Sequence, residues 1–589
     1  MTGAEYIAEF LRLKGSDKVF LMTGGAAAFI VDAISRNKGL KYVCFHHEQA
    51  AAMAADAVWR TSGKIGVTVA TSGPGATNLI TGIACSYFDS IPSIHITGQV
   101  NQNEKANYGG ANVRQAGFQE TKIVEMVRPI TKWATQVTNV QELKLALNKA
   151  YAIAPSGRPG PVLIDVPMDV QQAEAGEIEM DKPSSQSAPD VKAIQNARTK
   201  IEDFLKGSER PLLLVGAGIG LAGVEKATFA WIKDSGIPFV SSWNGETYFD
   251  HDLPNYCGNI GVYGNRGANF LIQNSDRLIV LGSRLDNRQR SGNTTKFAMS
   301  AKVLVLDVDA EELRKYGNNR EHSTAELDFK FLPQALEGLK VTRGTDAWTS
   351  FAREMKTKYF GKYSSSVATE KGTLSPYEVV RAANAAMNDD AVVAVDTGAN
   401  LCWVFQQFHR RKHTIFTAGG NSPMGYCLPA AIGAAIYSPG RQIVAFSGDG
   451  GFHLNIQELQ LLVHHKIPAK IFVMNNCGYG IIKQFQEQYL GGRYEATGNG
   501  YSIPDFGKVA RAYGLGYVKV TKMSDFDAKA VFASPEPTII DCILFPETTV
   551  EPKLGIGRSI EDQLPYMSNE EYAAGVRFVS PANLAEHRK

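Results

Sequence analysis

Glycines and oxygen-bearing side chains follow two neighbouring apolar runs in the last third of the chain. The run GDGG, residues 448–451, comes directly after the apolar residues 443–447, and Asn475–Asn476 ends the next apolar run. Because parallel strands present their carboxyl ends side by side, these residues are expected to meet at one sheet edge. Asp and Asn oxygens suit Mg²⁺, and glycines let backbone N–H groups approach an anion such as a diphosphate. A strand-end turn with a loop Asp is the ordinary alternative for GDGG alone, and the Asn pair favours the metal site.

Two other sequence patterns could belong to a functional site, but each also has a purely structural explanation. Glu48 follows an apolar run and opens a predicted helix, where an acid is also favoured by the helix dipole. Gly218, Gly220 and Gly223 form a G-x-G-x-x-G pattern after the apolar residues 211–215. That pattern is typical of dinucleotide-binding turns, but on its own it indicates a packing turn as often.

The elements that must position these residues alternate between short apolar runs and longer segments of helical period. This alternation predicts parallel strands joined by crossover helices in an α/β fold. There are more apolar runs than a single sheet needs. They include the runs that begin at Lys18, Gly66, Pro211, Arg277, Lys302, Ala391, Ile443 and Lys470. We therefore predict doubly wound parallel sheets in more than one domain.

Two polar breaks divide the apolar runs into three groups. Residues 180–190 are rich in Pro and Ser, and residues 362–376 are similar and end in a predicted capping box with Ser375 as N-cap, Pro376 at N1 and Glu378 at N3. The predicted domains are 1–180, 190–345 and 370–550, followed by a tail over 551–589. No short-period repeat occurs in the sequence, which excludes a solenoid.

Composition agrees with a large soluble protein. The 589 residues are 44% hydrophobic and 20% charged with a formal net charge of +2, which argues against disorder and against nucleic-acid binding. The uncharged stretch 414–440 contains prolines and glycines, so it is predicted to be a buried loop and helix instead of a membrane span. Seven scattered cysteines without a CxxC pattern argue against a disulfide scaffold and against a zinc site.

The N-terminal segment is predicted to be an amphipathic helix. Ile7, Phe10, Leu11 and Leu13 are assigned to one helical face, and no basic-then-apolar signal region precedes them. We therefore expect a cytoplasmic enzyme with no membrane partner.

The combination of GDGG with the Asn pair resembles the diphosphate-and-metal fingerprint of thiamine diphosphate enzymes. From about residue 2 to 550 the chain is similar to the acetolactate synthase branch of that family, for example in FHHEQAAAMAADA, TSGPGATNL, DSIPSIHITGQV and GGNSPMGYCLPAAIGAA. The resemblance implies a pyrimidine-binding domain, a central FAD-type domain and a diphosphate-binding domain. It also implies a homodimer or homotetramer, because the family builds each active site from two subunits.

The resemblance assigns thiamine diphosphate and Mg²⁺ to the C-terminal domain. The implied cofactor-binding residues there are Gly398, Asn400, Gly448, Asp449, Gly450, Gly451 and Asn476, with Asp449, Asn476 and Gly478 as metal ligands. Met424 matches the bulky residue that bends the cofactor, and a core methionine is its alternative. Glu48 would share a proton with the pyrimidine ring nitrogen. Phe118 and Gln119 would join Glu48 from the same subunit, with a solvated loop as their alternative.

The resemblance also implies FAD across the central domain. The matching residues are Arg158, Gly216, Gly218, Gly261, Tyr263, Gly282, Arg284 and Asp307. An Arg can pair with the FAD diphosphate, and an Asp at a strand end can bind adenine or ribose groups. The expected reaction has no net redox change, so the flavin would be structural.

The acceptor side of the expected site departs from the biosynthetic synthases. Arg288 matches their arginine at the second-substrate entrance, with a surface ion pair as its alternative. Phe485 stands where they carry Trp, and Met168 stands where they carry Lys. Asn287 replaces an Asp, and Ala399–Asn400 replaces a Gln–His pair that helps hold the diphosphate. These changes predict a wider and more adaptable entrance.

The sequence thus predicts a carboligase that decarboxylates pyruvate and transfers the two-carbon unit to a second carbonyl. Because acceptor-side residues depart from the synthases, the preferred acceptor is the keto group of a nucleotide-linked deoxysugar, and the long loop over 99–118 agrees with this. The tail segment 554–572 also resembles the tails of synthase-like proteins of deoxysugar pathways such as yersiniose synthesis. Acetolactate synthase, with a second pyruvate as acceptor, is one alternative, and a catalytically silent cofactor-binding homologue is the other.

Overall fold

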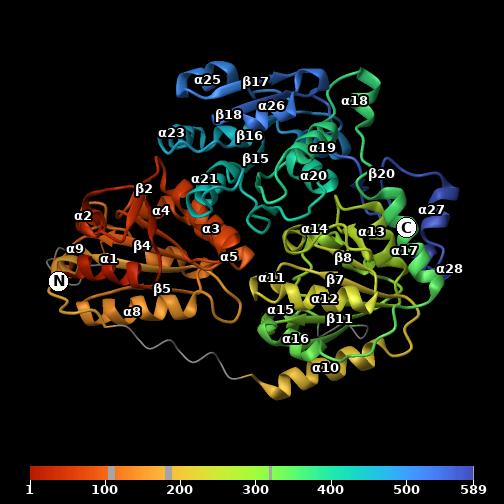
Figure 1. Ribbon diagram of the computed structural model, residues 1–589, viewed down its shortest axis with the longest axis horizontal. Coiled ribbons are helices and arrows are strands. Elements are labelled where there is room, and N and C mark those ends of the chain that lie inside the picture. The colour runs from red at the N-terminus through yellow and green to blue at the C-terminus, as the bar shows by residue number, and fades with distance from the viewer. Residues whose placement is uncertain (104–112, 180–188, 317–321, 588–589) are drawn as a thin grey trace.

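Three six-stranded parallel sheets form the framework of the molecule (Figure 1). The computed structural model describes residues 1–103, 113–179, 189–316 and 322–587. The three sheets follow one another along the chain, so the predicted α/β fold with three doubly wound parallel-sheet domains is confirmed. The limits given above for the domains stay a prediction, and residues 180–188 of the first polar break lie outside the described residues.

The first sheet belongs to the N-terminal part of the chain. Its strands, in spatial order, are β2 (Lys41–Cys44), β1 (Lys18–Leu21), β3 (Gly66–Ala70), β4 (Ser93–Gln99), β6 (Val162–Pro167) and β5 (Trp133–Gln136). Its helices are α1 (Gly3–Leu13), α2 (Ala28–Arg36), α3 (Glu48–Ser62), α4 (Pro74–Asn78), α5 (Ile80–Asp89), α7 (Ile123–Val127), α8 (Val140–Ile153) and α9 (Met168–Gln172).

The amphipathic face predicted for α1 is correct except at Leu13. Ile7, Phe10 and Leu11 are fully buried, whereas Leu13 is 44% exposed. Leu13 follows Leu11 by two positions, which turns its side chain by about 200° around the helix axis and away from the core.

The second sheet has the strand order of a dinucleotide-binding fold. Its strands, in spatial order, are β12 (His322–Glu326), β11 (Lys302–Asp307), β10 (Arg277–Leu281), β7 (Pro211–Val215), β8 (Phe239–Ser241) and β9 (Tyr256–Asn259). Its helices are α10 (Val191–Leu205), α11 (Gly218–Leu221), α12 (Glu225–Ser235), α13 (Arg266–Asn274), α14 (Asn287–Arg290), α15 (Ala310–Arg314), α16 (Leu332–Leu336) and α17 (Asp346–Tyr359). The order reverses between β7 and β10, and ligands of open α/β sheets bind at such a switch point.

The third sheet repeats the topology of the first. Its strands, in spatial order, are β14 (Thr414–Phe416), β13 (Val392–Val395), β15 (Ile443–Gly448), β16 (Lys470–Asn475), β18 (Thr538–Ile543) and β17 (Gly516–Val520). Its helices are α18 (Ser366–Lys371), α19 (Pro376–Ala386), α20 (Ala399–Gln407), α21 (Cys427–Tyr437), α22 (Asp449–His453), α23 (Leu459–His464), α24 (Gly480–Leu490), α25 (Phe506–Tyr513) and α26 (Ala528–Ala533). The switch point here lies between β13 and β15.

The capping box predicted at the start of α19 is only partly correct. Ser375 is the N-cap and Pro376 the first helical residue, as predicted. The Ser375 hydroxyl, however, makes no capping hydrogen bond and is buried without a partner among the described residues. The helix start therefore relies on the fixed φ of Pro376 instead of a side-chain cap.

Small residues join the first and third domains. The alanines of α3 pack against α21 in one continuous apolar cluster. A Cβ added at Gly433 would lie only 2.3 Å from the backbone oxygen of Ala54, so the two helices approach as closely as glycine allows. The uncharged stretch 414–440 contains the predicted loop and helix, α21, and it begins with the strand β14, which was not predicted.

The tail packs on the second domain (Figure 1). It contains β19 (Lys553–Leu554), β20 (Gln563–Leu564), α27 (Asn569–Gly575) and α28 (Pro581–His587). Gln273 of α13 donates from Nε2 to the buried Glu561 at 2.8 Å. None of the helices in the described ranges is both long and apolar enough for a membrane span.

Candidate active site

Asp449 lies at the switch point of the third sheet. β15 ends at Gly448 and α22 begins at Asp449, so GDGG forms a strand-to-helix turn, as predicted. The Asp449 carboxylate is buried, with Oδ1 accepting the N–H of Gly450 at 2.7 Å and Oδ2 accepting the N–H of Gly478 at 3.0 Å. The Tyr501 hydroxyl donates to Oδ1 at 3.1 Å. The turn after β16 is therefore held against the turn after β15.

Burial has the largest effect on the pKa of Asp449. Burial raises the pKa of Asp449 to about 6, although its hydrogen bonds and the charge of Lys483 act in the opposite direction. The described residues contain no cluster of three or more His, Cys, Asp or Glu side chains that could hold a metal by themselves. A cation at Asp449 would therefore need amide, backbone and ligand oxygens, which is the donor set that Mg²⁺ accepts.

The two asparagines after β16 have different surroundings. Asn475 donates from Nδ2 to Asp541 Oδ1 at 3.0 Å and accepts the N–H of Cys477 at 3.2 Å, so it stabilises the turn. Asn476 is buried, and its Nδ2 has no hydrogen-bond partner in the described parts of the chain. Because buried polar groups are normally paired, the free amide of Asn476 fits a ligand at this edge.

The turn after β13 contains the other residues predicted around the diphosphate. Gly398 has a φ of 110°, which favours glycine. The Asn400 amide donates to the backbone oxygens of Asp396 at 2.8 Å and Phe446 at 3.3 Å, so Asn400 links the ends of β13 and β15. Asn400 thus supports the turn, and its amide N–H groups are already used.

Met424 lies in the loop between β14 and α21, which a second buried carboxylate holds. Asp396 accepts the N–H of Gly425 at 2.9 Å and the Ser447 hydroxyl at 2.9 Å. Burial raises the pKa of Asp396 to about 6, while these hydrogen bonds lower it. Met424 is therefore fixed beside the ends of β13 and β15.

Glu48 and Gln119 meet at one glycine-rich turn of the first domain. Glu48 begins α3, is buried, and accepts from Asn78 Nδ2 at 2.9 Å. A Cβ added at Gly75 would lie 3.1 Å from Glu48 Oε1, and one at Gly73 would lie 2.9 Å from the Cβ of Gln119. Gln119 has a φ of 62°, a strained left-handed conformation of the kind that is common at functional sites.

The remaining predicted catalytic residues, Phe118, Phe485 and Arg288, are exposed in the single chain. No hydrogen bond in the described ranges links Glu48 to the third domain. Phe118 is 85% exposed, and Phe485 on α24 is 46% exposed and stacks on Tyr489 with ring centroids 4.4 Å apart. Arg288 is an exposed residue of α14, in the second domain.

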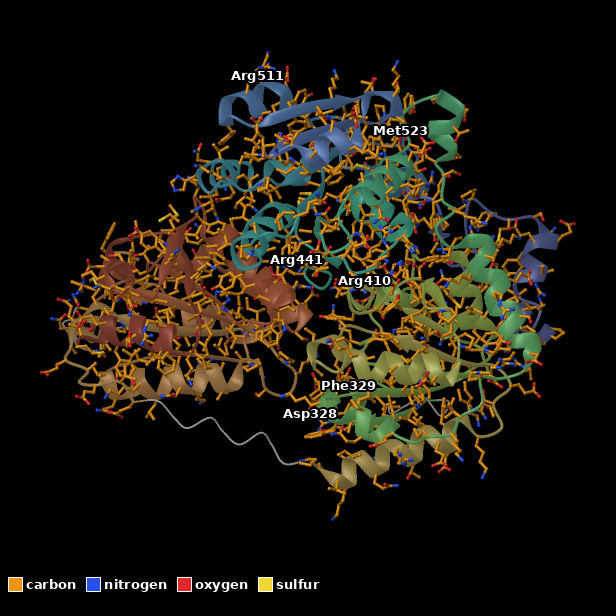
Figure 2. All side chains as sticks on the ribbon, viewed as in Figure 1. Asp328, Phe329, Arg410, Arg441, Arg511 and Met523 are labelled. Carbon is orange, nitrogen blue, oxygen red and sulfur yellow. The ribbon has the colours of Figure 1, made fainter. Side chains whose placement is uncertain are left out.

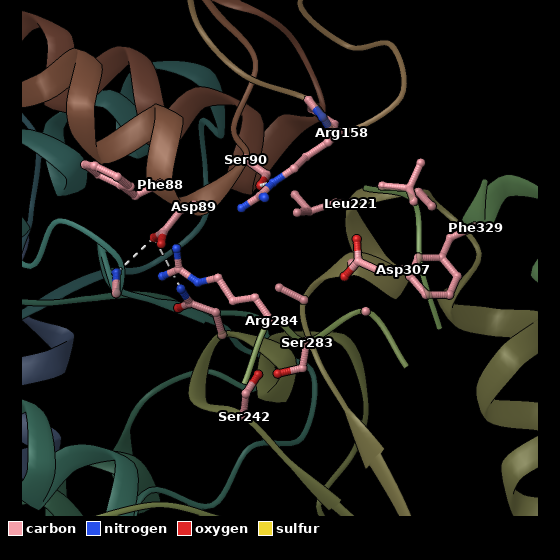
Figure 3. A pocket seen from close by; sticks show the side chains of 18 of the residues that line it. Phe88, Asp89, Ser90, Arg158, Leu221, Ser242, Ser283, Arg284, Asp307 and Phe329 are labelled. Atoms are coloured by element: carbon pink, nitrogen blue, oxygen red, sulfur yellow. Dashed lines mark hydrogen bonds between the residues drawn. The ribbon is translucent and has the colours of Figure 1, made fainter. Parts of the chain in front are cut away.

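A large cleft opens at the switch point of the second sheet (Figure 3). It encloses about 1270 Å³ of space that continues into solvent. Predicted residues that line it are Arg158, Gly218, Gly282, Arg284, Asp307 and Arg288. Phe329 lines the end opposite Phe88 (Figure 3), and the neighbouring Asp328, labelled in Figure 2, also lines the cleft. The position and the lining fit a dinucleotide such as FAD.

The polar residues of the cleft already have partners within the protein. Arg158 Nη1 lies 2.8 Å from Asp309 Oδ2 and 3.0 Å from Glu312 Oε1, and these acids raise the pKa of Arg158 against the effect of burial. Arg284 lies 3.7 Å from Asp286. Burial raises the pKa of Asp307, which ends β11. A diphosphate near Arg158 would compete with the two acids.

Three residues predicted for FAD lie outside the lining of the cleft. A Cβ at Gly216 would come within 2.1 Å of the Gly282 oxygen, so Gly216 permits close packing of two turns. Gly261 has a φ of 127° and packs on the backbone of Arg288. The Tyr263 ring is partly buried near Trp243, with ring centroids 6.5 Å apart.

Asp89 joins all three domains, and sequence patterns did not reveal it. Its carboxylate accepts from Arg60 Nη2 at 2.8 Å, from Asn244 Nδ2 at 3.3 Å, and from the N–H groups of Gly419 at 2.8 Å and Gly420 at 2.7 Å. The glycines belong to the loop that carries Met424, and Asp89 also lines the cleft (Figure 3). Its only sequence signal is its place in DSIPSIHITGQV.

Known proteins match this arrangement domain by domain. The family "Thiamine pyrophosphate enzyme, N-terminal TPP binding domain" matches residues 1–126, the central domain matches 199–325 and the C-terminal TPP binding domain matches 396–542. The acetolactate synthase large subunit of Parasynechococcus marenigrum (strain WH8102) is 33% identical over 98% of this chain and 92% of its own length. The chain belongs to the acetolactate synthase family of thiamine pyrophosphate enzymes.

Other relatives of this thiamine pyrophosphate enzyme have similar names. Acetolactate synthase isozyme 2 large subunit of Escherichia coli (strain K12) is 32% identical over 90% of this chain and 92% of its own length. The large subunit of Lactococcus lactis subsp. lactis (strain IL1403) is 31% identical over 96% of both chains. These names favour the alternative of a pyruvate acceptor over the deoxysugar acceptor that we preferred from the sequence.

Proposed function

We propose that this thiamine pyrophosphate enzyme is an acetolactate synthase, which decarboxylates one pyruvate and joins the remaining two carbons to the keto carbon of a second pyruvate. The observation that carries the proposal is the buried Asp449 carboxylate, which lies at a sheet switch point between the glycine N–H groups and the unpaired Asn476 amide. When bound, thiamine diphosphate supplies a thiazolium carbon that adds to the 2-keto group and accepts the electrons left by CO₂.

In this proposal the residues of the third domain hold the cofactor's charged end. Asp449, the amide oxygen of Asn476 and the backbone oxygen of Gly478 would hold Mg²⁺, and the N–H groups of the GDGG turn other than that of Gly450, which donates to Asp449, would hold the diphosphate. Asn400 keeps the ends of β13 and β15 together, so the two turns hold a fixed separation. Met424 precedes Gly425, whose N–H donates to Asp396, and from this position it would support the bent form of the cofactor.

Glu48 supplies the acid–base function in the proposal. Its carboxyl group is buried and held by Asn78, so it presents one oxygen toward the Gly73–Gly75 turn. From there it exchanges a proton with a ring nitrogen of the cofactor. Gln119, in the loop before α7, packs against Gly73 and would contact the reacting carbonyl from there.

The proposed active site lies between two subunits, in a homodimer or homotetramer. Within one chain, Glu48 makes its hydrogen bond in the first domain and Asp449 makes its own in the third. Phe118, 85% exposed, is an apolar side chain that gains cover from a second subunit. The pairing of Glu48 with Asp449 from another copy completes the acid–base group and the metal site.

FAD is proposed to occupy the cleft of the second domain in a structural role. The support for it is the dinucleotide-binding strand order and the glycines and arginines of the lining. The purified protein should therefore be yellow, and its flavin should stay oxidised during turnover with pyruvate. Failure of FAD to bind after reconstitution, or bleaching in proportion to product, would contradict this role.

A nucleotide-linked keto-deoxysugar is the second candidate acceptor, favoured by two departures from the synthases. Phe485 is smaller than Trp, and Met168 lacks the charge of Lys. Pyruvate alone should yield 2-acetolactate, identified by mass spectrometry, and adding 2-ketobutyrate should yield the mixed product. Formation of a branched sugar as the main product when both acceptors are present would replace the first candidate with the second.

A further inference from the structure

A buried carboxylate of the third domain holds the segment that leads into Glu48. Glu458 ends the 3₁₀ helix Ile456–Glu458, and its side chain is fully buried. The backbone N–H of His46 donates to Glu458 Oε1 at 3.1 Å and to Oε2 at 3.3 Å. Oε2 also lies 3.3 Å from the ring Nδ1 of His46. A side chain of the third domain therefore binds the backbone of the first domain just before Glu48.

This contact lies where α3 begins. His47 is the N-cap of α3, and its ring Nδ1 accepts the N–H of Gln49 at 3.1 Å. Because His47 connects the bound segment to the first helical residue, Glu48, its position fixes the backbone from which the Glu48 side chain extends. Asn78 holds the other end of that side chain, the carboxylate. Glu48 is thus held at two points, and Glu458 holds it from outside its own domain.

Glu458 differs from the rest of this interface between domains. The packing of α3 on α21 is apolar, and burial of a carboxylate has a desolvation cost that apolar packing avoids. Burial accordingly raises the pKa of Glu458, while its hydrogen bonds from the backbone of His46 and His47 lower it. The carboxylate is therefore not needed to close the interface, and what it adds is a fixed position for the start of α3.

The segment that carries Glu458 also leads back to the metal turn. α22 begins at Asp449, and the chain continues from it into the 3₁₀ helix that ends at Glu458. In the proposed dimer, Glu48 of one chain faces Asp449 of the other. Each Glu458 therefore supports the acid of one active site, while its own chain supplies the metal turn of the other site.

We infer that Glu458 is a positioning residue for Glu48. By holding the start of α3, it keeps the Glu48 carboxyl group within hydrogen-bonding distance of the cofactor's ring nitrogen. The inference rests on the proposed function of Glu48. Proton exchange needs about 2.6–3.2 Å between the two heavy atoms, so a shift of about 1 Å at this end of α3 slows it strongly.

The first test measures hydrogen–deuterium exchange at the thiazolium carbon of the bound cofactor by NMR after an acid quench. Glu458→Gln keeps the length of the side chain but removes its charge, so the bonds to His46 weaken and the exchange rate should fall about tenfold or more. The affinity for thiamine diphosphate with Mg²⁺ should stay close to that of wild type. Glu458→Asp, which keeps the charge on a shorter side chain, should lie between wild type and Glu458→Gln.

Glu561→Gln is the matched control, because Glu561 is an equally buried carboxylate in the tail. Its replacement should leave the exchange rate unchanged. If Glu458→Gln does not fold, Glu458→Asp replaces it in the same comparison. Exchange at the wild-type rate in the Glu458 variants would overturn the inference, and so would slow exchange that is explained by loss of bound cofactor.

Mixed dimers separate the two active sites. The reference dimer pairs an Asp449→Ala subunit with a Glu48→Gln subunit, so that one site keeps both residues. Glu458→Gln in the Asp449→Ala subunit removes the support of the working Glu48 and should lower the activity about tenfold. In the Glu48→Gln subunit the same change accompanies the working Asp449 and should leave most of the activity. Equal effects, or the reverse order, would overturn the inference.

Failure of the proposed function gives a different result. Exchange at the wild-type rate in Glu48→Gln would overturn the proposed role of Glu48 itself. An inactive reference dimer would contradict the proposed arrangement of subunits, and the exchange rates of the Glu458 variants would then decide on the inference.

Discussion

At the scale of single residues, the sequence predicted residues that a local pattern marks. It did not predict residues whose role depends on contacts with distant parts of the chain. Asp449 could be placed at a strand end because GDGG directly follows an apolar run. Asp89 could not be found, because it contacts Gly419, 330 positions away, and no local pattern indicates such a partner. The strained φ of Gln119 and the free Nδ2 of Asn476 likewise become visible only in the structure.

Replacement of Asp449 by Ala should release the cofactor. The change removes the one carboxylate from the donor set, so the affinity for thiamine diphosphate with Mg²⁺ should fall by about 100-fold or more. Fluorescence titration with the cofactor measures this, and Asp505→Ala, at the exposed start of α25, is the control. If Asp449→Ala had the cofactor affinity and the activity of wild type, the assignment of Asp449 as a metal ligand would be wrong.

At the scale of elements, the apolar runs predicted the strands reliably. Each of the eight runs contains a strand of one of the three sheets. The short edge strands β2, β5 and β17 are partly exposed and mixed in polarity, so their sequences carry a weaker signal. The part of the long entrance loop at 104–112 lies outside the described residues, and its predicted width stays a prediction.

The loop that carries Met424 should depend on Asp89. In Asp89→Asn the charge that holds the N–H groups of Gly419 and Gly420 is lost, and a charged hydrogen bond contributes about 1.5–3 kcal/mol. Hydrogen exchange at these two amides should therefore accelerate about tenfold or more, as measured by mass spectrometry of a peptide over 417–425. Asp165→Asn, which changes a buried carboxylate of the same domain, should leave this peptide unchanged. Equal exchange in both variants would show that Asp89 does not hold the loop.

At the scale of the whole molecule, interfaces between domains hold buried ionisable groups. Glu246 lies between the second and third domains, where Asn259 donates both to Glu246 Oε1 at 2.7 Å and to the Phe405 oxygen at 2.8 Å. Burial raises the pKa of Glu246 to about 8. The folded protein therefore holds a proton that the unfolded chain releases near its usual pKa of 4.5.

Glu246→Gln should change how stability depends on pH. In wild type the contribution of Glu246 is complete below about pH 4.5 and is lost as pH rises to about 8, because ionisation favours the unfolded chain. Gln mimics the protonated acid at every pH. The melting temperature of the variant relative to wild type should thus increase from pH 5 to pH 8. A constant difference across this range would contradict a protonated Glu246.

The arrangement of subunits can be tested with mixed dimers. If Glu48 of one subunit serves Asp449 of another, a dimer of one Glu48→Gln and one Asp449→Ala subunit contains one intact site. Such a dimer should regain up to about half the activity of a wild-type dimer, although each variant alone is inactive. Co-expression with two affinity tags isolates the mixed dimer. No recovery of activity would place both residues in one subunit.

The central claim is that the chain makes a carbon–carbon bond from two pyruvates at the Asp449 site. The most direct measurement is the amount of CO₂ released and of 2-acetolactate formed when pyruvate is the only substrate, with and without thiamine diphosphate and Mg²⁺. The account predicts one 2-acetolactate for each CO₂, only when both cofactors are present. Release of CO₂ with acetaldehyde as the product, or no CO₂ from the fully loaded enzyme, would contradict it.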